Sequence, residues 1–448
     1  MPSVTVIGLD DTDSRVTGMC TTYVATALAE RIEAAGASVD ERLLVRLNPA
    51  VERKTRGNAA LALHTDMAVE DAFEVAVDAV SSLSAADDRT SPGVVAAGGD
   101  PNAVPDAVSR FCRESLRRIK ELDEALLLAD RCGFRHAAVP LEGDTDHSGY
   151  GRIGALAAVG APNALKAWTY EHVAYRYRKR CGTPRSVDIE SVFAAAAAGY
   201  PRAWDTVDRG ETEAVCVPNA PGPVLYGIRG EDPEACRTVA DGIESEPVER
   251  SATFRTNQGT DVHVRPGDVG GLREDAGYVV EGVVVARPET RRGGHTFFDL
   301  ANPADVLAPP PESGVTLASD ARTVTCAAFE PTKRFRDRVR ALRAGDAVTA
   351  VGEHDAGTIK LEKFALRSPV DCELTTPDCP GCGRSMESAG RDQGYRCRRC
   401  GTAEPGRTLV ELDRAIAPGW YEVPPCARRH VAKPLIRGGF DAPVHPER

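Results

Sequence analysis

The stretch VTVIGLDDTDS, residues 4–14, decides the class of the first fold in this chain. Its first six residues are mostly aliphatic or β-branched, which is typical of a strand buried inside a sheet. An acidic turn follows directly, and residues 21–35 then form a predicted helix that ends near Gly36. A strand, an acidic turn and a helix follow one another here, so the carboxylates lie at the carboxyl end of a predicted buried strand, where a ligand site is a candidate.

The mixed pattern continues through the N-terminal half. Further elements are expected in these ranges: strands at 43–47 and 60–63, helices at 105–131, 153–158 and 164–180, then a strand at 224–228 and a helix at 233–243. The last two predict a β-α-β region of the ferredoxin-like kind. In the predicted helix 164–180, the residues Trp168, His172 and Tyr175 recur about once per turn, and core packing is favoured over base stacking for them.

The pattern becomes all-β after about residue 267. Five short apolar runs are separated by Gly, Pro and Asp turns, at 278–285, 296–300, 324–329, 347–351 and 358–366. Short strands with Arg-rich connections predict an OB-type barrel, although another small barrel also fits the pattern. The run Pro309 to Pro311 would lie in one of its loops.

Composition favours a soluble protein with several cores. Of the 448 residues, 42% are hydrophobic and 27% are charged. No apolar run reaches the roughly 20 residues needed to span a bilayer, and the start lacks the features of a signal peptide. A membrane partner is therefore not expected, and the predicted location is the cytoplasm.

The formal net charge of −11 argues at first against a nucleic-acid partner. Only eight of the 55 basic residues are lysines, however, and this scarcity with excess Asp and Glu resembles proteins of salt-loving archaea. In such a chain local arginine clusters are more informative than the global charge. RNA recognition in high salt would then depend more on shape and stacking.

The strongest chemical motif is a pair of C-x-x-C knuckles. Cys379 and Cys382 are followed, after fourteen intervening residues, by Cys397 and Cys400. Four thiolates at this spacing predict a closed, structural zinc ribbon, and the other nine scattered cysteines fit a reducing compartment. Arginines at 396, 398 and 399 beside the second knuckle suggest contact with nucleic acid.

Two further motifs suit nucleotide phosphates. Asp10, Asp11 and Asp13 follow the buried strand and could hold magnesium, while Thr21 and Thr22 begin the next helix after the turn at Gly18. An ordinary strand–turn–helix with Asp caps is the alternative. The second motif is a loop whose donors match a polyphosphate clamp, although a solvated loop is an equal alternative; its members are Arg46, Asn48, Lys54, Arg56 and Asn58.

The stretch GYGRIG, residues 149–154, spells the dinucleotide-binding fingerprint. It follows a polar segment and not an apolar strand, so the structural context of that fingerprint is missing and NAD is not expected. A glycine loop that opens a helix remains a candidate ligand site.

Taken together, these motifs resemble the archaeal tRNA(Ile) 2-agmatinylcytidine synthetase family. The resemblance runs in order along nearly the whole chain. It rests on the segments 8–14 with 18–23, 46–49 with 54–58, 153–158 and 223–230, on the two cysteine knuckles, and on Ala427 to His430.

The resemblance implies an ATP-dependent ligase that joins agmatine to C2 of the wobble cytidine of tRNA(Ile) with a CAU anticodon, so that AUA codons are read. A phosphate from ATP would activate the C2 oxygen, agmatine would displace it, and ATP would end as AMP and phosphate. ATP, Mg²⁺ and Zn²⁺ are the implied cofactors, and tRNA and agmatine the partners, with no DNA expected. The threonine after Gly-Met-Cys, here Thr21, would be phosphorylated by the enzyme itself.

The implied fold is a multidomain α+β protein. Its expected parts are a kinase-like α/β ATP-binding region at 1–200, a ferredoxin-like domain at 201–265, an OB-fold β-barrel at 266–370, a zinc ribbon at 371–410 and a basic C-terminal tail at 411–448. The implied catalytic residues are Asp10, Asp11, Asp13, Thr21, Lys54 and Arg56. ATP contacts are implied for Gly18, Thr21, Thr22, Arg46, Asn48, Lys54 and Asn58, magnesium contacts for Asp10 and Asp11, and RNA contacts for Arg398, Arg399, Arg428, Arg429 and His430.

Two other classes of function remain as alternatives. A non-catalytic RNA-binding adaptor would explain the barrel and the ribbon but not the acidic turn or the Lys54 loop. A small-molecule kinase would explain the acidic turn but not the RNA-type modules.

Overall fold

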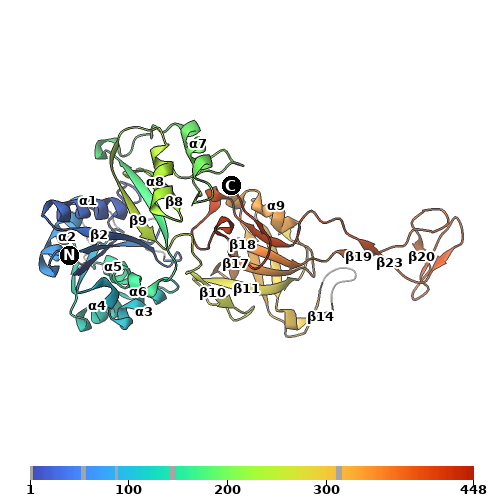
Figure 1. The fold of residues 1–448 in the computed structure, drawn as a ribbon. Helices are drawn as coiled ribbons and strands as arrows, with labels where there is room; N and C mark the ends of the chain where they lie inside the picture. Colours follow the sequence, from blue (N-terminus) through green and yellow to red (C-terminus); the bar gives the residue numbers. More distant parts are fainter. Residues whose placement is uncertain (1–3, 52–56, 86–88, 142–147, 309–314) are drawn as a thin grey trace.

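The computed structural model describes residues 4–51, 57–85, 89–141, 148–308 and 315–448. The molecule is elongated (Figure 1): the N-terminal half is built on one large sheet, a barrel lies beside it, and the C-terminal ribbon stands off on a narrow arm. Within the described residues no helix is long and apolar enough to cross a membrane.

One nine-stranded sheet organises the N-terminal half. Its strands, in spatial order, are β5 (Arg135–Ala138), β4 (Gly93–Gly98), β1 (Thr5–Asp10), β3 (Ala59–Thr65), β2 (Val39–Arg46), β9 (Val248–Thr256), β6 (Thr169–Arg176), β8 (Val224–Gly230) and β7 (Ala203–Trp204). Neighbours are antiparallel except β2 and β9, which pair in parallel through Leu43 and Leu44. That pair joins the two halves of the sheet into one continuous surface.

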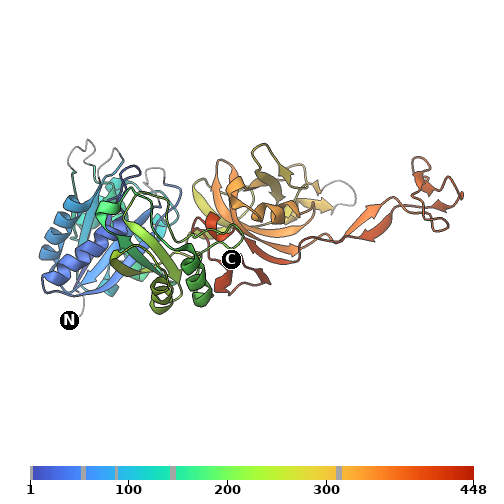
Figure 2. The ribbon, with the colours of Figure 1, turned by 90° about the horizontal axis from the view of Figure 1, so that it is seen from above.

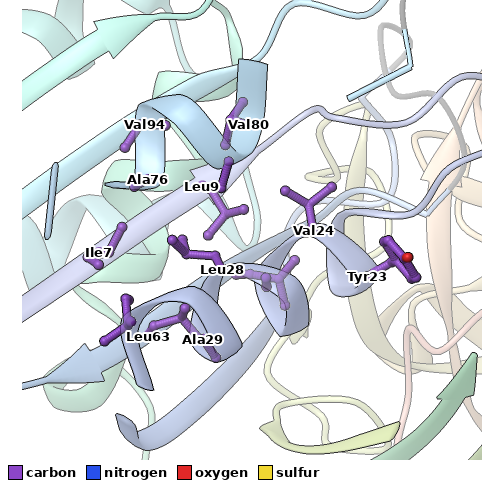
Figure 3. Close-up of a cluster of buried hydrophobic side chains, with 14 of the residues drawn as sticks. Ile7, Leu9, Tyr23, Val24, Leu28, Ala29, Leu63, Ala76, Val80 and Val94 are labelled. Atoms are coloured by element: carbon purple, nitrogen blue, oxygen red, sulfur yellow. The ribbon is translucent and has the colours of Figure 1, made fainter. Parts of the chain in front are cut away.

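Helices cover both faces of this sheet. They are α1 (Thr21–Ala34) and α2 (Val69–Leu83) on one face, α3 (Asp106–Ser115), α4 (Leu122–Arg131), α5 (Gly151–Val159) and α6 (Ala161–Ala164) on the other, and α7 (Ile189–Gly199) with α8 (Pro233–Asp241) against β6 and β8. Alternate residues of β1 point to opposite faces, so Ile7 and Leu9 pack against Leu28 of α1 and Val80 of α2 (Figure 3). The polar end of β1 is thereby fixed at the edge of a solid core.

The predicted all-β region is a closed five-stranded barrel. Each strand pairs with the next and the last pairs with the first, in the order β11 (Ala276–Val284), β13 (Thr296–Ala301), β16 (Thr323–Ala328), β18 (Thr358–Ser368) and β17 (Ala347–Asp355). All five predicted runs are therefore confirmed as strands. Smaller elements complete this part: β10 (Val264–Gly267), β12 (Glu289–Thr290), β14 (Val306–Ala308), β15 (Thr316–Leu317), α9 (Phe335–Arg340), β24 (Gly419–Glu422) and β25 (Val444–His445). Pro309 to Pro311 lie outside the described residues.

The arm consists of β19 (Cys372–Thr375) paired with β23 (Thr408–Glu411). Beyond it a small sheet carries the cysteine knuckles, formed by β20 (Glu387–Ser388), β21 (Tyr395–Arg396) and β22 (Ala403–Glu404). Seen from above, the ribbon lies at the far end of the molecule from α1 and α2 (Figure 2).

The predicted helix 164–180 is wrong, because most of it is strand β6. Its alternate residues Thr169, Val173 and Tyr175 are buried, and β6 bonds to β8 on one side and β9 on the other. Pairing with two strands outweighs the weak helical spacing that suggested otherwise. The expectation that Tyr175 packs in a core is confirmed.

The predicted helix 105–131 is interrupted. Helix α3 ends at Ser115 and α4 begins at Leu122. Between them Arg117 Nε donates to the carbonyl of Val262 at 2.7 Å, and the carbonyl of Leu116 lies 3.1 Å from Nδ1 of His263. Residues 116 and 117 thus bond to Val262 and His263, and the helix is interrupted at this point.

Two of the expected domain limits separate strands that pair directly with each other. A limit at residue 200 falls between β6 and its neighbours β8 and β9, which bond to it directly. The expected tail 411–448 includes β24, which pairs with β18 of the barrel. We therefore predict a first boundary nearer residue 165 and a C-terminal segment that belongs with the barrel.

Candidate active-site cavity

A cavity of about 670 Å³ lies where the elements of the two half-sheets meet. Its wall is formed by the end of β1, the start of α1, the end of β2, the start of α5, and residues of β6 and β8. The predicted residues that line it are Asp10, Asp11, Asp13, Thr21, Thr22, Arg46 and Asn58. The acidic turn and the described part of the phosphate loop, which were separate predictions, thus meet at one place.

The acidic turn is held in a fixed shape. The backbone of Asp11 is left-handed, with φ of 60°, and its amide donates to Asp10 Oδ1 at 2.7 Å. Asp11 Oδ2 in turn accepts from the amide of Ser91 at 3.0 Å. Burial, followed by repulsion from Asp11, raises the pKa of Asp10 well above its usual value. Such a cluster of carboxylates suits a divalent cation, which would compensate the repulsion.

Two glycines bring the start of α5 against this turn. A methyl group on Gly154 would lie 1.9 Å from Asp10 Oδ2, and one on Gly151 would lie 2.5 Å from the Asp10 carbonyl oxygen. The glycine spacing of residues 149–154 therefore serves close packing of a helix on the acidic turn.

The start of α1 also faces the cavity. Thr12 Oγ1 donates to Thr21 Oγ1 at 3.1 Å, and Cys20 Sγ lies 3.0 Å from Thr22 Oγ1. Burial, together with the nearby charge of Asp13, raises the pKa of the Cys20 thiol. Amides at a helix start attract phosphate, so this wall of the cavity suits the anionic part of a nucleotide.

The phosphate loop is only partly described. Burial lowers the pKa of Arg46, whose Nε finds no hydrogen-bond partner among the described residues, although its Nη1 donates to the Gly57 carbonyl at 3.4 Å. Asn48 does not line the cavity; its side chain donates to the Asp275 carbonyl at 3.1 Å and accepts from the Ala50 amide at 3.0 Å. Lys54 and Arg56 lie outside the described residues.

Several cavity residues were not predicted from the sequence. They are Arg118, Ile119 and Lys120 in the break between α3 and α4, Glu171 of β6, Arg185, Cys216, Arg229 of β8, and Asp275. A correct strand prediction for 169–176 would have indicated Glu171, because it is a carboxylate on the same face as Val173 and Tyr175. Arg229 belongs to β8 and the others come from loops, and the approach of all of them to the cavity depends on the tertiary fold.

A second cavity of about 460 Å³ shares Arg46, Asn58 and Asp275 with the first and reaches the barrel. Arg429 and His430 line it, and Arg429 also pairs with Glu353 and Glu362 at 2.7 and 2.5 Å. Arg428 differs from both, because its side chain is only 6% exposed and lies between two buried carboxylates. Contact between Arg428 and RNA would require these pairs to break.

The four predicted zinc ligands are brought together at the tip of the arm. The sulfur atoms of Cys379, Cys382, Cys397 and Cys400 all lie within 4.8 Å of one another. Sulfur atoms bound 2.3 Å from a tetrahedral zinc are roughly 3.8 Å apart, so the four thiols fit this ion. Beside them Arg398 is 82% exposed and Arg399 is also exposed.

The fold and the site define a multidomain protein that joins an acidic, nucleotide-sized cavity to a barrel and a zinc ribbon, two modules common in nucleic-acid-binding proteins. Family models match three parts of the chain: the TiaS TCKD domain at residues 6–68, the TiaS FLD domain at 149–263 and the TiaS C-terminal zinc ribbon domain at 376–416. The tRNA 2-agmatinylcytidine synthetase TiaS from Haloquadratum walsbyi is 53% identical, and the match covers 99% of this chain and 100% of the relative. The chain belongs to the TiaS family.

Solved structures agree with this assignment. A complex of TiaS with its isoleucine tRNA and ATP is 37% identical, with a TM-score of 0.85 over 100% of both chains. A complex of TiaS with the same tRNA, AMPCPP and agmatine is 35% identical, with a TM-score of 0.83 over 100% of both chains. The resemblance inferred from the sequence motifs is therefore confirmed along the whole length of the chain.

Proposed function

We propose that this chain is an ATP-dependent ligase that attaches agmatine to C2 of the wobble cytidine of tRNA(Ile) with a CAU anticodon. The observation that carries the proposal is the single cavity that joins Asp10, Asp11 and Asp13 to the start of α1 and to Arg46. It lies in a chain that is 53% identical to a synthetase of this name over nearly its full length. The expected domain types, kinase-like, ferredoxin-like and OB-fold, are part of the same proposal.

Each wall of the cavity has a part in the proposed reaction. The C2 oxygen of cytidine is a poor leaving group, and transfer of a phosphoryl group from ATP to it makes it a good one. Phosphate oxygens would lie at Thr21 and Thr22, where helix amides and hydroxyls can donate to them. Arg46, whose Nε has no partner among the described residues, would balance charge that develops on the transferred group.

Amine attack completes the reaction. The primary amine of agmatine forms a bond to C2, the bond from C2 to the phosphorylated oxygen breaks, and the amine loses one proton. The target base must leave its stack to reach a cavity so deep in the protein. Phosphorylation of Thr21 by the enzyme itself remains a proposal from the family resemblance.

Magnesium and zinc have separate proposed sites. Asp10 and Asp11 would hold magnesium, which would neutralise phosphate charge when bound. The four thiols of the ribbon form a closed set with no position for substrate, so their zinc would be structural. Arg398, Arg399, Arg429 and His430 are proposed RNA contacts.

Nucleotide turnover tests the proposal against its two alternatives. Transfer of one phosphoryl group to the C2 oxygen leaves ADP, so formation of AMP requires water to hydrolyse a second phosphate bond. We expect AMP and phosphate to accumulate only when ATP, agmatine and the tRNA transcript are all present. Repeated turnover without tRNA, with more than one AMP or ADP formed per protein, would favour a small-molecule kinase, because phosphorylation of Thr21 accounts for at most one. Binding of tRNA with no nucleotide turnover, under conditions where the protein is folded, would favour the adaptor.

A further inference from the structure

The carboxylate of Glu171 in the cavity wall is oriented by two neighbours. Gln258 Nε2 donates to its Oε2, and Arg229 Nε lies 3.4 Å from its Oε1. The side chains of Glu171 and Arg229 are only 8% and 16% exposed. The direction in which this carboxylate faces the cavity therefore depends on the position of Arg229.

A second carboxylate, Asp205, directly follows β7, and the charge of Arg229 acts on it. Arg229 of β8 lies opposite Trp204 of β7 in the sheet register, and Asp205 is the next residue. Asp205 has a left-handed backbone, with φ of 55°, and its side chain is 3% exposed. Its Oδ2 accepts no hydrogen bond from any residue that the structure describes. A carboxylate so placed depends on neighbouring cations to remain ionised.

Arg428, from the C-terminal segment, supplies the second cation. Its Nε lies 3.3 Å from Asp205 Oδ1, and its Nη2 lies 2.7 Å from Glu422 Oε1. Glu422 belongs to β24 of the barrel sheet, and it accepts from the amides of Leu435 and Glu447 at 2.8 and 3.1 Å. Arg428 is thus fixed by the barrel on one side and by Asp205 on the other.

We propose that Asp205 and Arg428 are positioning residues of the cavity. Buried charges alternate in sign from the cavity wall to the barrel, in the order Glu171, Arg229, Asp205, Arg428 and Glu422. Glu171 contacts Arg229, and Asp205 contacts Arg428, which contacts Glu422; Arg229 and Asp205 interact through their charges and not through a direct ion pair among the described residues. This interaction holds Arg229 and so sets the orientation of Glu171 toward a cationic amine. The inference rests on the proposed function, because agmatine is the dication that the cavity would receive.

The consequence of breaking the network follows from charge balance. Without the Arg428 cation, Arg229 is the remaining cation whose charge favours the ionised form of Asp205. Arg229 would then be drawn toward Asp205 and away from Glu171. Salt weakens the attraction between buried charges only a little. Between exposed charges it acts strongly, because the Debye length is only roughly 3 Å at 1 M salt. The network would therefore persist in concentrated salt, where surface ion pairs contribute little.

The test compares two arginines of the same segment. Arg428→Gln breaks the network, whereas the control Arg414→Gln breaks a buried ion pair with Asp346 of the barrel, at 2.7 Å, which includes no member of the network. We expect Arg428→Gln to raise the KM for agmatine at least about tenfold while the KM for ATP stays within about twofold, and Arg414→Gln to change neither. The double variant Asp205→Asn/Arg428→Gln restores charge balance and should recover most of the loss.

Equal effects of the two single variants, or no recovery in the double variant, would show a merely structural role. If Arg428→Gln does not fold, Arg428→Lys replaces it, with a smaller rise in the agmatine KM expected and an unchanged KM overturning the proposal. If the wild-type protein forms no product, the proposed function fails separately. Equilibrium dialysis with labelled agmatine then tests the role of the network. Equal agmatine binding by wild type and Arg428→Gln would contradict that role.

Discussion

Among single residues, Asp11 provides the sharpest test of the acidic turn. Replacing it with alanine removes one carboxylate of the proposed magnesium site, so we expect Asp11→Ala to lower modification at least about 100-fold. The variant should still bind tRNA, because the turn lies inside the cavity. Label incorporation and a gel shift measure the two properties.

Asp78→Ala is the matched control for that variant. Asp78 lies on α2 with its side chain 78% exposed, and it pairs with Arg31 on the surface. Its loss should leave modification unchanged. Normal modification by Asp11→Ala would contradict the role of the acidic turn.

His263 gives a prediction about pH and stability. Burial lowers the pKa of His263 to about 4, and its Nδ1 lies 3.1 Å from the Leu116 carbonyl oxygen. In the unfolded chain His263 takes up a proton as the pH falls through about 6.5, whereas in the folded protein it stays neutral until about pH 4. The stabilisation is therefore fully present above about pH 6.5 and is lost as the pH falls toward 4. The loss should reach about 3 kcal/mol.

The glutamine variant isolates this effect. In His263→Gln the side-chain amide can still donate to Leu116, but it does not titrate. Urea unfolding between pH 7 and pH 4 should show a fall in the free energy of unfolding that is smaller in the variant by about 3 kcal/mol. The same fall in both proteins would show that His263 is not the group responsible.

The sequence predicted individual site residues best where they are close in the chain. Asp10, Asp11, Asp13, Thr21 and Thr22 belong to one strand–turn–helix unit, whose local geometry brings them together. Glu171, Arg229 and Asp205 come from three strands or their ends, and only the pairing of β6, β7 and β8 places them side by side. Because these three residues are far apart in the chain, their spacing in the sequence does not predict that they lie together.

Among elements, short apolar runs bounded by turns were predicted and elements shaped by distant partners were not. All five barrel strands are such runs, separated by Gly, Pro and Asp turns. Strand β6 was missed because Trp168, His172 and Tyr175 recur about once per helical turn, while Glu171, His172 and Arg176 interrupt its apolar residues. The break between α3 and α4 depends on Val262 and His263, more than 140 residues away, which local sequence cannot report.

Loss of the zinc site tests whether the ribbon takes part in binding tRNA. Converting Cys397 and Cys400 to serine should remove the bound zinc, because two of four thiolates are lost. We expect tRNA affinity to fall at least about tenfold, since the exposed Arg398 and Arg399 would lose their fixed positions. ATP binding by the distant cavity should persist.

Cys372→Ser is the control for the ribbon variant. Cys372 lies in β19 of the arm and is not part of the four-thiol cluster. Zinc content, measured by mass spectrometry of the metal, should stay at one per chain in this control. Full ATP-dependent modification by the zinc-free variant would show that the ribbon is dispensable.

At the scale of the whole molecule, the long shape places the proposed RNA contacts of the ribbon far from the cavity (Figures 1 and 2). The cavity lies in the N-terminal half and the ribbon at the opposite end, with the barrel between them (Figures 1 and 2). The C-terminal segment joins the two larger parts, since Arg334, on the N-terminal side of α9, contacts Asp208 and Glu447 at 2.9 and 2.6 Å. A partner as extended as tRNA could contact both ends at once.

The most direct measurement follows labelled agmatine into RNA. Purified protein in high salt receives ATP, magnesium, labelled agmatine and a tRNA(Ile) transcript with a CAU anticodon, and the RNA is then digested to nucleosides and weighed. We predict that label enters RNA only when ATP is present, on a cytidine heavier by agmatine less water. Folded protein that binds the transcript but yields neither labelled cytidine nor AMP would contradict it.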